Sequence, residues 1–197
     1  MEKKVKDLTI VISGLPGAGS STLSKEIANE LNYEYFSPGE YFKKTFGGLS
    51  SEAALAGWKT EMGKSKEFHK KIDEMQIELA KRKRVVICGK LSLYFLKDLA
   101  DLKIWLEASL GTRAKRTAMR DGISFEKALE ILKERERKES KEFKRIYNLD
   151  YYSLKNLADY VIDNDKLTVE EAKQKILHLI ASNFSFFKSS LKVKNFK

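Results

Sequence analysis

The stretch GLPGAGSST at residues 14–22 lies directly after the apolar run LTIVIS at 8–13 and before a segment with helical periodicity. Its three glycines permit positive φ, so that successive backbone amides can turn toward one anion. A helix that begins near Ser20 adds its free amides and the positive end of its dipole. Strand, glycine loop and helix in this order predict a phosphate-binding loop in an α/β fold.

The loop departs from the pattern G-x-x-x-x-G-K-[ST] because Ser20 stands where the lysine is expected. A lysine there makes a charge-assisted contact that contributes roughly 1.5–3 kcal/mol. The amides and the helix dipole remain, so we expect a weakened site that still binds phosphate. Ser21 takes the serine or threonine place, whose hydroxyl joins the shell of a Mg²⁺ ion. The residues expected to hold phosphates are Gly14, Leu15, Pro16, Gly17, Ala18, Gly19, Ser20, Ser21 and Thr22.

Short apolar runs alternate with helical stretches along the chain, which favours an α/β fold with a mainly parallel sheet. The runs lie at residues 8–13, 33–37, 85–88, 102–107 and 160–163. Leu23, Ile27 and Leu31 share one face of the first helix, and we expect that face to lie on the sheet. Further helices are expected at 64–83, 124–145 and 168–181.

The helix expected at 124–145 contains the run KERERKESKE at 133–142, which has no apolar residue. A helix that is polar on every side is either solvated or closes over a charged ligand. The periodicity of the run alone does not choose between these two interpretations.

Composition predicts one domain, at residues 1–183, followed by a basic aromatic tail at 184–197. The net charge of +10 suits polyphosphate ligands, and also nucleic acid or an anionic membrane surface. No run approaches the roughly 18 apolar residues of a membrane span, and the first residues are too charged for a secretory signal. We therefore expect a cytoplasmic protein. The tail is interpreted as a loosely ordered or edge-packing terminus, in preference to one that stacks on bases or contacts a membrane.

A few residue types that often carry chemistry are interpreted here as structural. Cys88 is the single cysteine, so it forms no internal disulfide, and we expect a buried thiol in a strand. His69 and His178 have no metal-ligand spacing. Trp58 and Trp105 are expected in or near the core.

With these motifs in place, the sequence resembles the nucleoside monophosphate kinases, and most closely the archaeal-type cytidylate kinases. Five segments carry the resemblance, in register along the chain. They are LTIVISGLPGAGSSTLSKEIA at 8–28, YFSPGEYFK at 35–43, KIDEMQIELAK at 71–81, LKIWL at 102–106 and DGISFEKAL at 121–129.

The resemblance implies a three-layer P-loop NTPase fold with a parallel five-stranded sheet and helical acceptor-binding and lid segments. It also implies transfer of the γ-phosphoryl group of ATP to CMP or dCMP with Mg²⁺, by a protein that we expect to be a monomer. The residues it assigns are Gly14–Thr22 and Arg116 for ATP, Ser21 for Mg²⁺, Gly39, Glu40, Lys43 and Gln76 for the acceptor, and Lys90, Arg120 and Arg135 for catalysis.

The sequence departs from the family pattern at six further positions, and at two of them, Lys43 and Lys90, a lysine stands where the family has an arginine. Cys88 replaces the acidic residue of the family's EGR, and Glu74 and Met75 replace two arginines. Glu142 replaces the second lid arginine and is expected to bring a carboxylate to where a phosphate would approach. These departures keep two alternatives open: a paralogue that binds nucleotide, RNA or a protein partner without catalysis, and a kinase for AMP or UMP. The expected partners are ATP and a nucleoside monophosphate, and nucleic acid is possible but not favoured.

Overall fold

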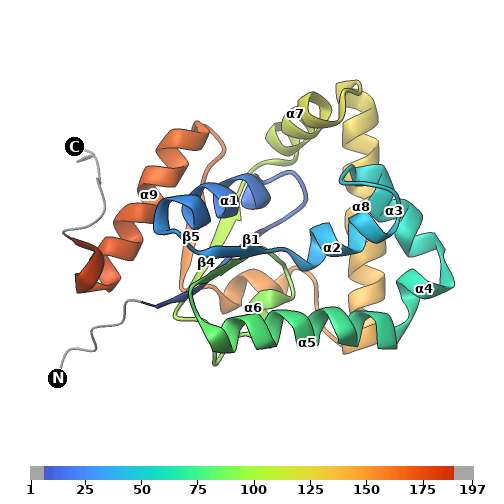
Figure 1. Cartoon of the computed structure of the whole chain (residues 1–197). Helices are drawn as coiled ribbons and strands as arrows, with labels where there is room; N and C mark the ends of the chain where they lie inside the picture. Colours follow the sequence, from blue (N-terminus) through green and yellow to red (C-terminus); the bar gives the residue numbers. More distant parts are fainter. Residues whose placement is uncertain (1–6, 189–197) are drawn as a thin grey trace.

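The computed structural model describes residues 7–188, and a five-stranded parallel sheet lies at its centre (Figure 1). The strands lie in the order β2-β3-β1-β4-β5, and each neighbouring pair is parallel. Their bounds are Thr9–Gly14 for β1, Glu34–Phe36 for β2, Val85–Ile87 for β3, Leu102–Glu107 for β4 and Tyr160–Asp163 for β5. Each predicted apolar run corresponds to one strand, with β1 ending one residue beyond its run, and the predicted fold class is confirmed.

Helices cover both faces of the sheet and complete three layers. On one face, α1 (Ser20–Leu31) lies beside α9 (Val169–Asn183). On the other face lie α5 (Lys66–Arg82), the short α6 (Ser92–Phe95) and the 3-10 turn η1 (Ser153–Leu157). This arrangement covers a parallel sheet on both sides, as its apolar strands require.

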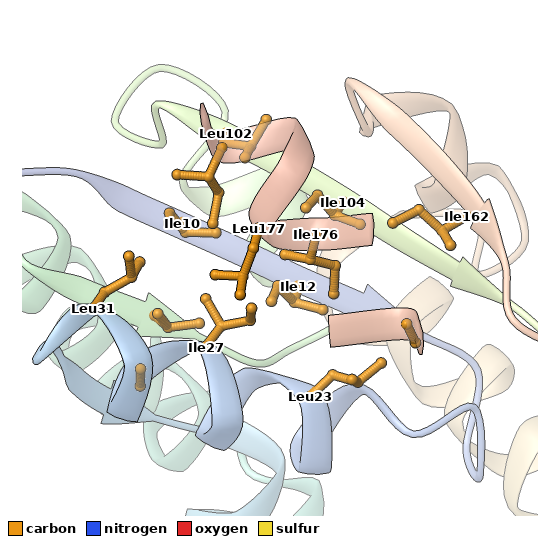
Figure 2. Packing of buried hydrophobic residues seen from close by; sticks show 14 of the residues in the cluster. Ile10, Ile12, Leu23, Ile27, Leu31, Leu102, Ile104, Ile162, Ile176 and Leu177 are labelled. Atoms are coloured by element: carbon orange, nitrogen blue, oxygen red, sulfur yellow. The ribbon is translucent and has the colours of Figure 1, made fainter. Parts of the chain in front are cut away.

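The hydrophobic core lies on both sides of β1, which is buried along its whole length. Ile10 and Ile12 belong to the cluster between the sheet and the layer of α1 and α9, as Figure 2 shows. Val11 belongs to the cluster on the opposite face. Burial of each such side chain contributes about 1.5–3 kcal/mol. The predicted stripe of α1, which is Leu23, Ile27 and Leu31, packs in the first of these clusters.

Further helices gather where the strands end. The segment after β2 forms α2 (Pro38–Thr45), α3 (Ser51–Lys59) and α4 (Glu61–Lys64), and the segment after β4 forms α7 (Leu110–Asp121) and α8 (Phe125–Tyr147). α8 packs against both α3 and α7. Because ligands bind outside the carboxyl ends of the strands in such folds, these helices surround the expected site.

The ends of the predicted helices shift by a few residues, and side-chain caps explain the shifts. Ser65 accepts a hydrogen bond from the Phe68 amide at 3.2 Å, so α5 begins at Lys66 and not at residue 64 as predicted. Thr168 and Glu171 form a capping box that starts α9. The sequence patterns did not predict the short helices α2, α3, α4 and α6.

The residues interpreted as structural are confirmed in part. Trp58 and Trp105 are buried, and so is Cys88, which lies just after β3 instead of within it. His69 is buried among aromatic rings, whereas His178 is exposed. Among residues 7–188, no group of three His, Cys, Asp or Glu side chains is placed to hold a metal ion.

The beginning of the predicted tail is described, and the rest is not. Phe187, in the 3-10 turn η2 (Ser185–Lys188), is buried in the cluster that contains α1 and α9. Residues 189–197 lie outside the described part of the chain. In that part, no helix is long and apolar enough to cross a membrane.

Candidate active site

The glycine loop forms a tight turn between β1 and α1 that only small residues permit. Gly17 and Gly19 have φ values of 84° and 94°, in the left-handed region. A Cβ atom at Gly17 would also lie 2.7 Å from the Arg113 carbonyl oxygen. Gly19 precedes α1 without a side-chain cap, which leaves the amides of the first helical turn for a ligand. The loop therefore has the geometry of the predicted phosphate cradle.

Two arginines of α7 hold this loop from behind. Arg113 is buried, donates to the Pro16 carbonyl oxygen at 3.1 Å, and pairs with Glu136 of α8. Arg116 donates to the carbonyl oxygens of Ala18 at 3.3 Å and Asn164 at 2.7 Å. Arg116, predicted to bind ATP, therefore lies beside the loop, and Arg113 supports the loop in a way that the sequence analysis missed.

Ser21 and Cys88 lie next to each other at the start of α1. The Ser21 Oγ atom is 3.6 Å from the Cys88 Sγ atom, and both residues line one cleft. A thiol therefore lies beside the loop hydroxyl, whereas P-loop NTPases hold Mg²⁺ with this hydroxyl and an aspartate. Glu40 lines the same cleft, but its carboxylate is held by Lys25 at 2.9 Å and by the Tyr35 hydroxyl at 3.0 Å.

The predicted acceptor residues of α2 reach this cleft because Ser37 fixes the start of that helix. The Ser37 hydroxyl accepts from the Glu40 amide at 3.1 Å and donates to the Cys88 carbonyl oxygen at 2.9 Å. The cap thus joins the beginning of α2 to the end of β3. All the predicted acceptor and catalytic residues except Gln76 line this first cleft and come from distant segments; they are Gly39, Glu40, Lys43, Lys90, Arg120 and Arg135.

A second cleft lies on the other side of the loop, with a volume of about 560 Å³ against about 140 Å³ for the first. Arg116 and Thr22 line this second cleft. Six residues line both clefts, which therefore meet at the phosphate loop; they are Gly17, Ser20, Ser21, Glu40, Lys43 and Arg120.

Lys43 is a buried cation at this junction. Its Nζ atom donates to the Leu49 carbonyl oxygen at 2.9 Å, and within residues 7–188 no carboxylate forms an ion pair with it. Burial, together with the charges of Arg135 and Arg120, lowers the pKa of Lys43 to about 8. The remaining N–H groups of this ammonium group are available to an anion.

Two further cations of the first cleft share one carboxylate. Glu139 of α8 accepts from Arg135 Nε at 2.7 Å and from the Tyr151 hydroxyl at 3.0 Å, and it pairs with Lys90 Nζ at 3.1 Å. Burial alone would raise the pKa of Glu139, but the charges of Arg135 and Lys90 lower it to about 2. One face of the polar run of α8 therefore lies buried against the cleft and is held there by ion pairs, so the helix is not solvated on every side. Its closure over a charged ligand stays a prediction.

Gln76 differs from the other predicted site residues, because it is fully buried and does not line either cleft. Its amide donates to Asp73 at 3.0 Å and accepts from the Ser92 hydroxyl at 2.6 Å, and both partners line the first cleft. The predicted contact of Gln76 with the acceptor stays a prediction, and the geometry links Gln76 to the cleft through these two neighbours.

The acidic substitution at Glu142 does not bring a carboxylate into the clefts. Glu142 is buried, and its oxygens face Arg145 Nε at 2.7 Å and Lys138 Nζ at 3.8 Å. It lines neither cleft, so the expectation that it would meet an incoming phosphate is wrong. Glu74 is exposed on α5, where it pairs with Lys70.

Solved structures of kinases share this fold. A shikimate kinase from Acinetobacter baumannii matches with a TM-score of 0.60 and 21% identity, over 89% of this chain and 94% of the other. A shikimate kinase from Aquifex aeolicus matches with a TM-score of 0.55 and 17% identity, over 89% and 98% of the two chains. At these identities the similarity shows the fold alone. A phosphate loop between two cation-lined clefts on this fold defines a P-loop kinase-like protein.

Sequence comparison identifies the family within this class. The profile of the cytidylate kinase-like family matches residues 9–166. The cytidylate kinase of Pyrobaculum calidifontis is 32% identical over 96% of this chain and 99% of its own length. That of Methanocaldococcus jannaschii is 36% identical over 83% of this chain and 92% of its own length. The chain therefore belongs to the cytidylate kinase-like family, and the resemblance read from its motifs is confirmed.

Proposed function

We propose that this protein transfers the γ-phosphoryl group of ATP to CMP or dCMP. The observation that carries the proposal is that two clefts meet at the phosphate loop, with Lys43 and Arg120 lining both. Such a junction lets the phosphates of two nucleotides approach each other from opposite sides. Membership in the cytidylate kinase-like family supports CMP as the acceptor.

In this proposal each cleft holds one nucleotide. ATP lies in the second, larger cleft, with its phosphates on the loop amides and beside Arg116. The monophosphate lies in the first cleft, where Lys90 and Arg135 face its phosphate. Phosphoryl transfer depends mainly on positioning and on neutralising the charge that spreads over the transferred group. Arg120 and Lys43 are the cations placed to do so at the junction.

Ser21 is the residue of this chain that would hold Mg²⁺, through its hydroxyl at the start of α1. Mg²⁺ usually keeps several waters and binds through substrate phosphates with few protein ligands, so one hydroxyl is compatible with it. The neighbouring Cys88 offers a soft sulfur in place of an oxygen ligand. When bound, the ion neutralises charge on the phosphates of ATP. The protein supplies the remaining compensation through its lysines and arginines.

The test is to incubate the purified protein with ATP, Mg²⁺ and one monophosphate at a time, and to measure ADP release. We expect turnover with CMP and dCMP to exceed that with UMP and AMP. Absence of turnover with every monophosphate would reject the proposal, and an equal or higher rate with AMP or UMP would reject the choice of acceptor.

A matched pair of variants on α8 checks that the turnover comes from this site. Arg135→Met removes a cation that lines the first cleft, whereas Arg137→Met removes an exposed arginine of the same helix. Loss of one charge-assisted contact predicts a decrease in kcat/KM of at least about tenfold for Arg135→Met. Arg137→Met is expected to keep the unmodified activity. Equal activity of the two variants would contradict the assignment of the first cleft.

A further inference from the structure

One wall of the first cleft contains a buried carboxylate to which the proposed function assigns no role. Asp73 lies on α5, is 8% exposed and lines the cleft. Its Oδ2 atom accepts from the Tyr147 hydroxyl at 2.6 Å, and its Oδ1 atom accepts from the Gln76 amide at 3.0 Å. Ser92 in turn donates to Gln76 at 2.6 Å. This chain of hydrogen bonds fixes the orientation of the carboxyl group.

No cation balances this carboxylate in the described part of the chain. Asp73 forms no ion pair there, and the charged side chain that affects it is the acidic Glu74. Burial, reinforced by Glu74, raises the pKa of Asp73 to about 6, so the group is mainly ionised at neutral pH. Each carboxylate oxygen can accept more than one hydrogen bond. A buried acceptor with spare capacity on a cleft wall fits a ligand that donates a hydrogen bond.

The walls around Asp73 suit a flat heterocycle. Phe42, Trp58 and His69 line the cleft, with ring centroids 4.7 Å apart for Phe42 and Trp58 and 4.9 Å apart for Trp58 and His69. Tyr147, which orients Asp73, also lines it. Aromatic walls stack on or meet the edge of a planar ring, while a fixed polar group on such a wall selects among rings of similar shape.

We propose that the Asp73 carboxylate accepts a hydrogen bond from the exocyclic 4-amino group of cytosine, and thereby sets the preference for CMP over UMP. This inference rests on the proposed function. Uracil carries a carbonyl oxygen where cytosine carries the amino group, so an ionised carboxylate would face another acceptor there. A site built around a buried hydrogen bond rejects the ligand that lacks the partner, because its polar group is then left unpaired. Gln76 acts as a positioning residue that holds Asp73.

The experiment compares Asp73→Asn with Glu74→Gln, a matched control at the next, exposed position of α5. kcat/KM is measured for CMP, for UMP and for a CMP analogue with hydrogen in place of the 4-amino group. Asp73→Asn is expected to lower kcat/KM for CMP roughly ten- to a hundredfold, the range for a hydrogen bond to a charged group. kcat/KM for UMP is expected to stay or to rise, since an amide can donate to the uracil oxygen. The unmodified protein should lose a similar factor with the analogue, and the KM for ATP should not change.

A combined comparison separates this role from a merely structural one. If Asp73 contacts the amino group, the ratio of kcat/KM for CMP to kcat/KM for the analogue should be close to one in Asp73→Asn. In Glu74→Gln this ratio should equal that of the unmodified protein. An unchanged CMP-to-UMP ratio in Asp73→Asn, or an equal loss with both acceptors, would overturn the proposal. If Asp73→Asn does not fold, the analogue on the unmodified protein decides: full activity with it overturns the contact.

The same proteins distinguish failure of this inference from failure of the proposed function. If the unmodified protein turns over no monophosphate, the proposed function fails, and binding of CMP and UMP is then measured by calorimetry. Weaker CMP binding by Asp73→Asn than by Glu74→Gln, with unchanged UMP binding, still supports the role of Asp73. Equal CMP binding by the two variants rejects it. If CMP is phosphorylated without the expected change in preference, the assignment of Asp73 alone fails.

Discussion

Replacing Ser20 with lysine restores the cation that the phosphate loop lacks. Ser20 is the first residue of α1, and it lines both clefts at their junction. No side chain caps this helix, so its first amides face the space that a phosphate would fill. A lysine at this position therefore begins next to the bound anion, and Ser20→Met provides a side chain of similar length without the charge.

The expected gain in affinity follows from two opposing contributions. A hydrogen bond from an ammonium group to phosphate contributes roughly 1.5–3 kcal/mol. Ordering the lysine side chain in the complex costs about 0.5–1.5 kcal/mol. When the lower limits are taken together and the upper limits together, the net is about 1–1.5 kcal/mol, which corresponds to ATP binding roughly five- to twelvefold tighter. A cation at the positive end of the α1 dipole also destabilises the unliganded protein by about 0.3–1 kcal/mol. Affinity and stability should thus change in opposite directions.

Calorimetric titration with ATP and Mg²⁺ measures the affinity, and urea unfolding without nucleotide measures the stability. Ser20→Lys should bind ATP more tightly than Ser20→Met, and the difference should shrink as salt is raised, because it is electrostatic. If the two variants fold normally and bind ATP equally, the phosphates do not lie on this loop, and the account of the loop as a working cradle is refuted.

Three further predictions concern the other groups of the site. Glu139→Gln leaves Lys90 and Arg135 buried without their counter-charge and should lower the free energy of unfolding, measured with urea, by about 3–5 kcal/mol. A mixture of ATP and CMP should stabilise this variant more than it stabilises the unmodified protein. Equal stabilisation would contradict the network. Raising the pH through about 8 deprotonates Lys43, so kcat/KM for CMP should fall about tenfold from pH 7 to 9. Lys43→Arg should remove most of this fall. If the variant and the unmodified protein show the same pH dependence of kcat/KM, another group titrates. Cys88→Asp adds an oxygen ligand beside the loop hydroxyl and should raise the apparent affinity for Mn²⁺ and Mg²⁺ at least about tenfold relative to Cys88→Ser. Electron paramagnetic resonance measures Mn²⁺ binding, and titration of the activity with Mg²⁺ at fixed ATP measures the affinity for Mg²⁺.

The local features of the site could be predicted from sequence because they depend on near neighbours. The loop between β1 and α1 follows from three glycines placed between a β-branched run and a helical stripe. The strands follow from short apolar runs, each separated from the next by a helical stretch. The convergence of Lys90, Arg120 and Arg135 did not follow from spacing, because these residues come from different elements, and it was predicted through the family resemblance.

Asp73 and Glu139 were missed, although Asp73 left a signal in the sequence. Asp73 and Gln76 lie on the buried face of α5 between Ile72 and Leu79, so they are polar residues at positions that the helical period assigns to the interior. Such residues need partners in the fold, and the partners of Asp73 and Glu139 lie on other elements or in the cleft. The pattern thus predicts that these residues have a role but cannot identify their partners. For Glu142 the same lack of tertiary information led to the wrong prediction that its carboxylate points toward the phosphate.

The shared carboxylate explains how a run without apolar residues can supply buried positions to the lid helix. Burying Arg135 and Lys90 unpaired would cost several kcal/mol for each charge, and pairing each with its own acid would cancel the field that an incoming phosphate needs. One carboxylate between them satisfies both cations at 2.7 and 3.1 Å and leaves the trio with one positive charge. Tyr151 donates a further hydrogen bond to Glu139, which holds the carboxylate without changing that charge. The arrangement therefore keeps α8 folded against the cleft before a nucleotide binds, and it keeps the cleft attractive to an anion.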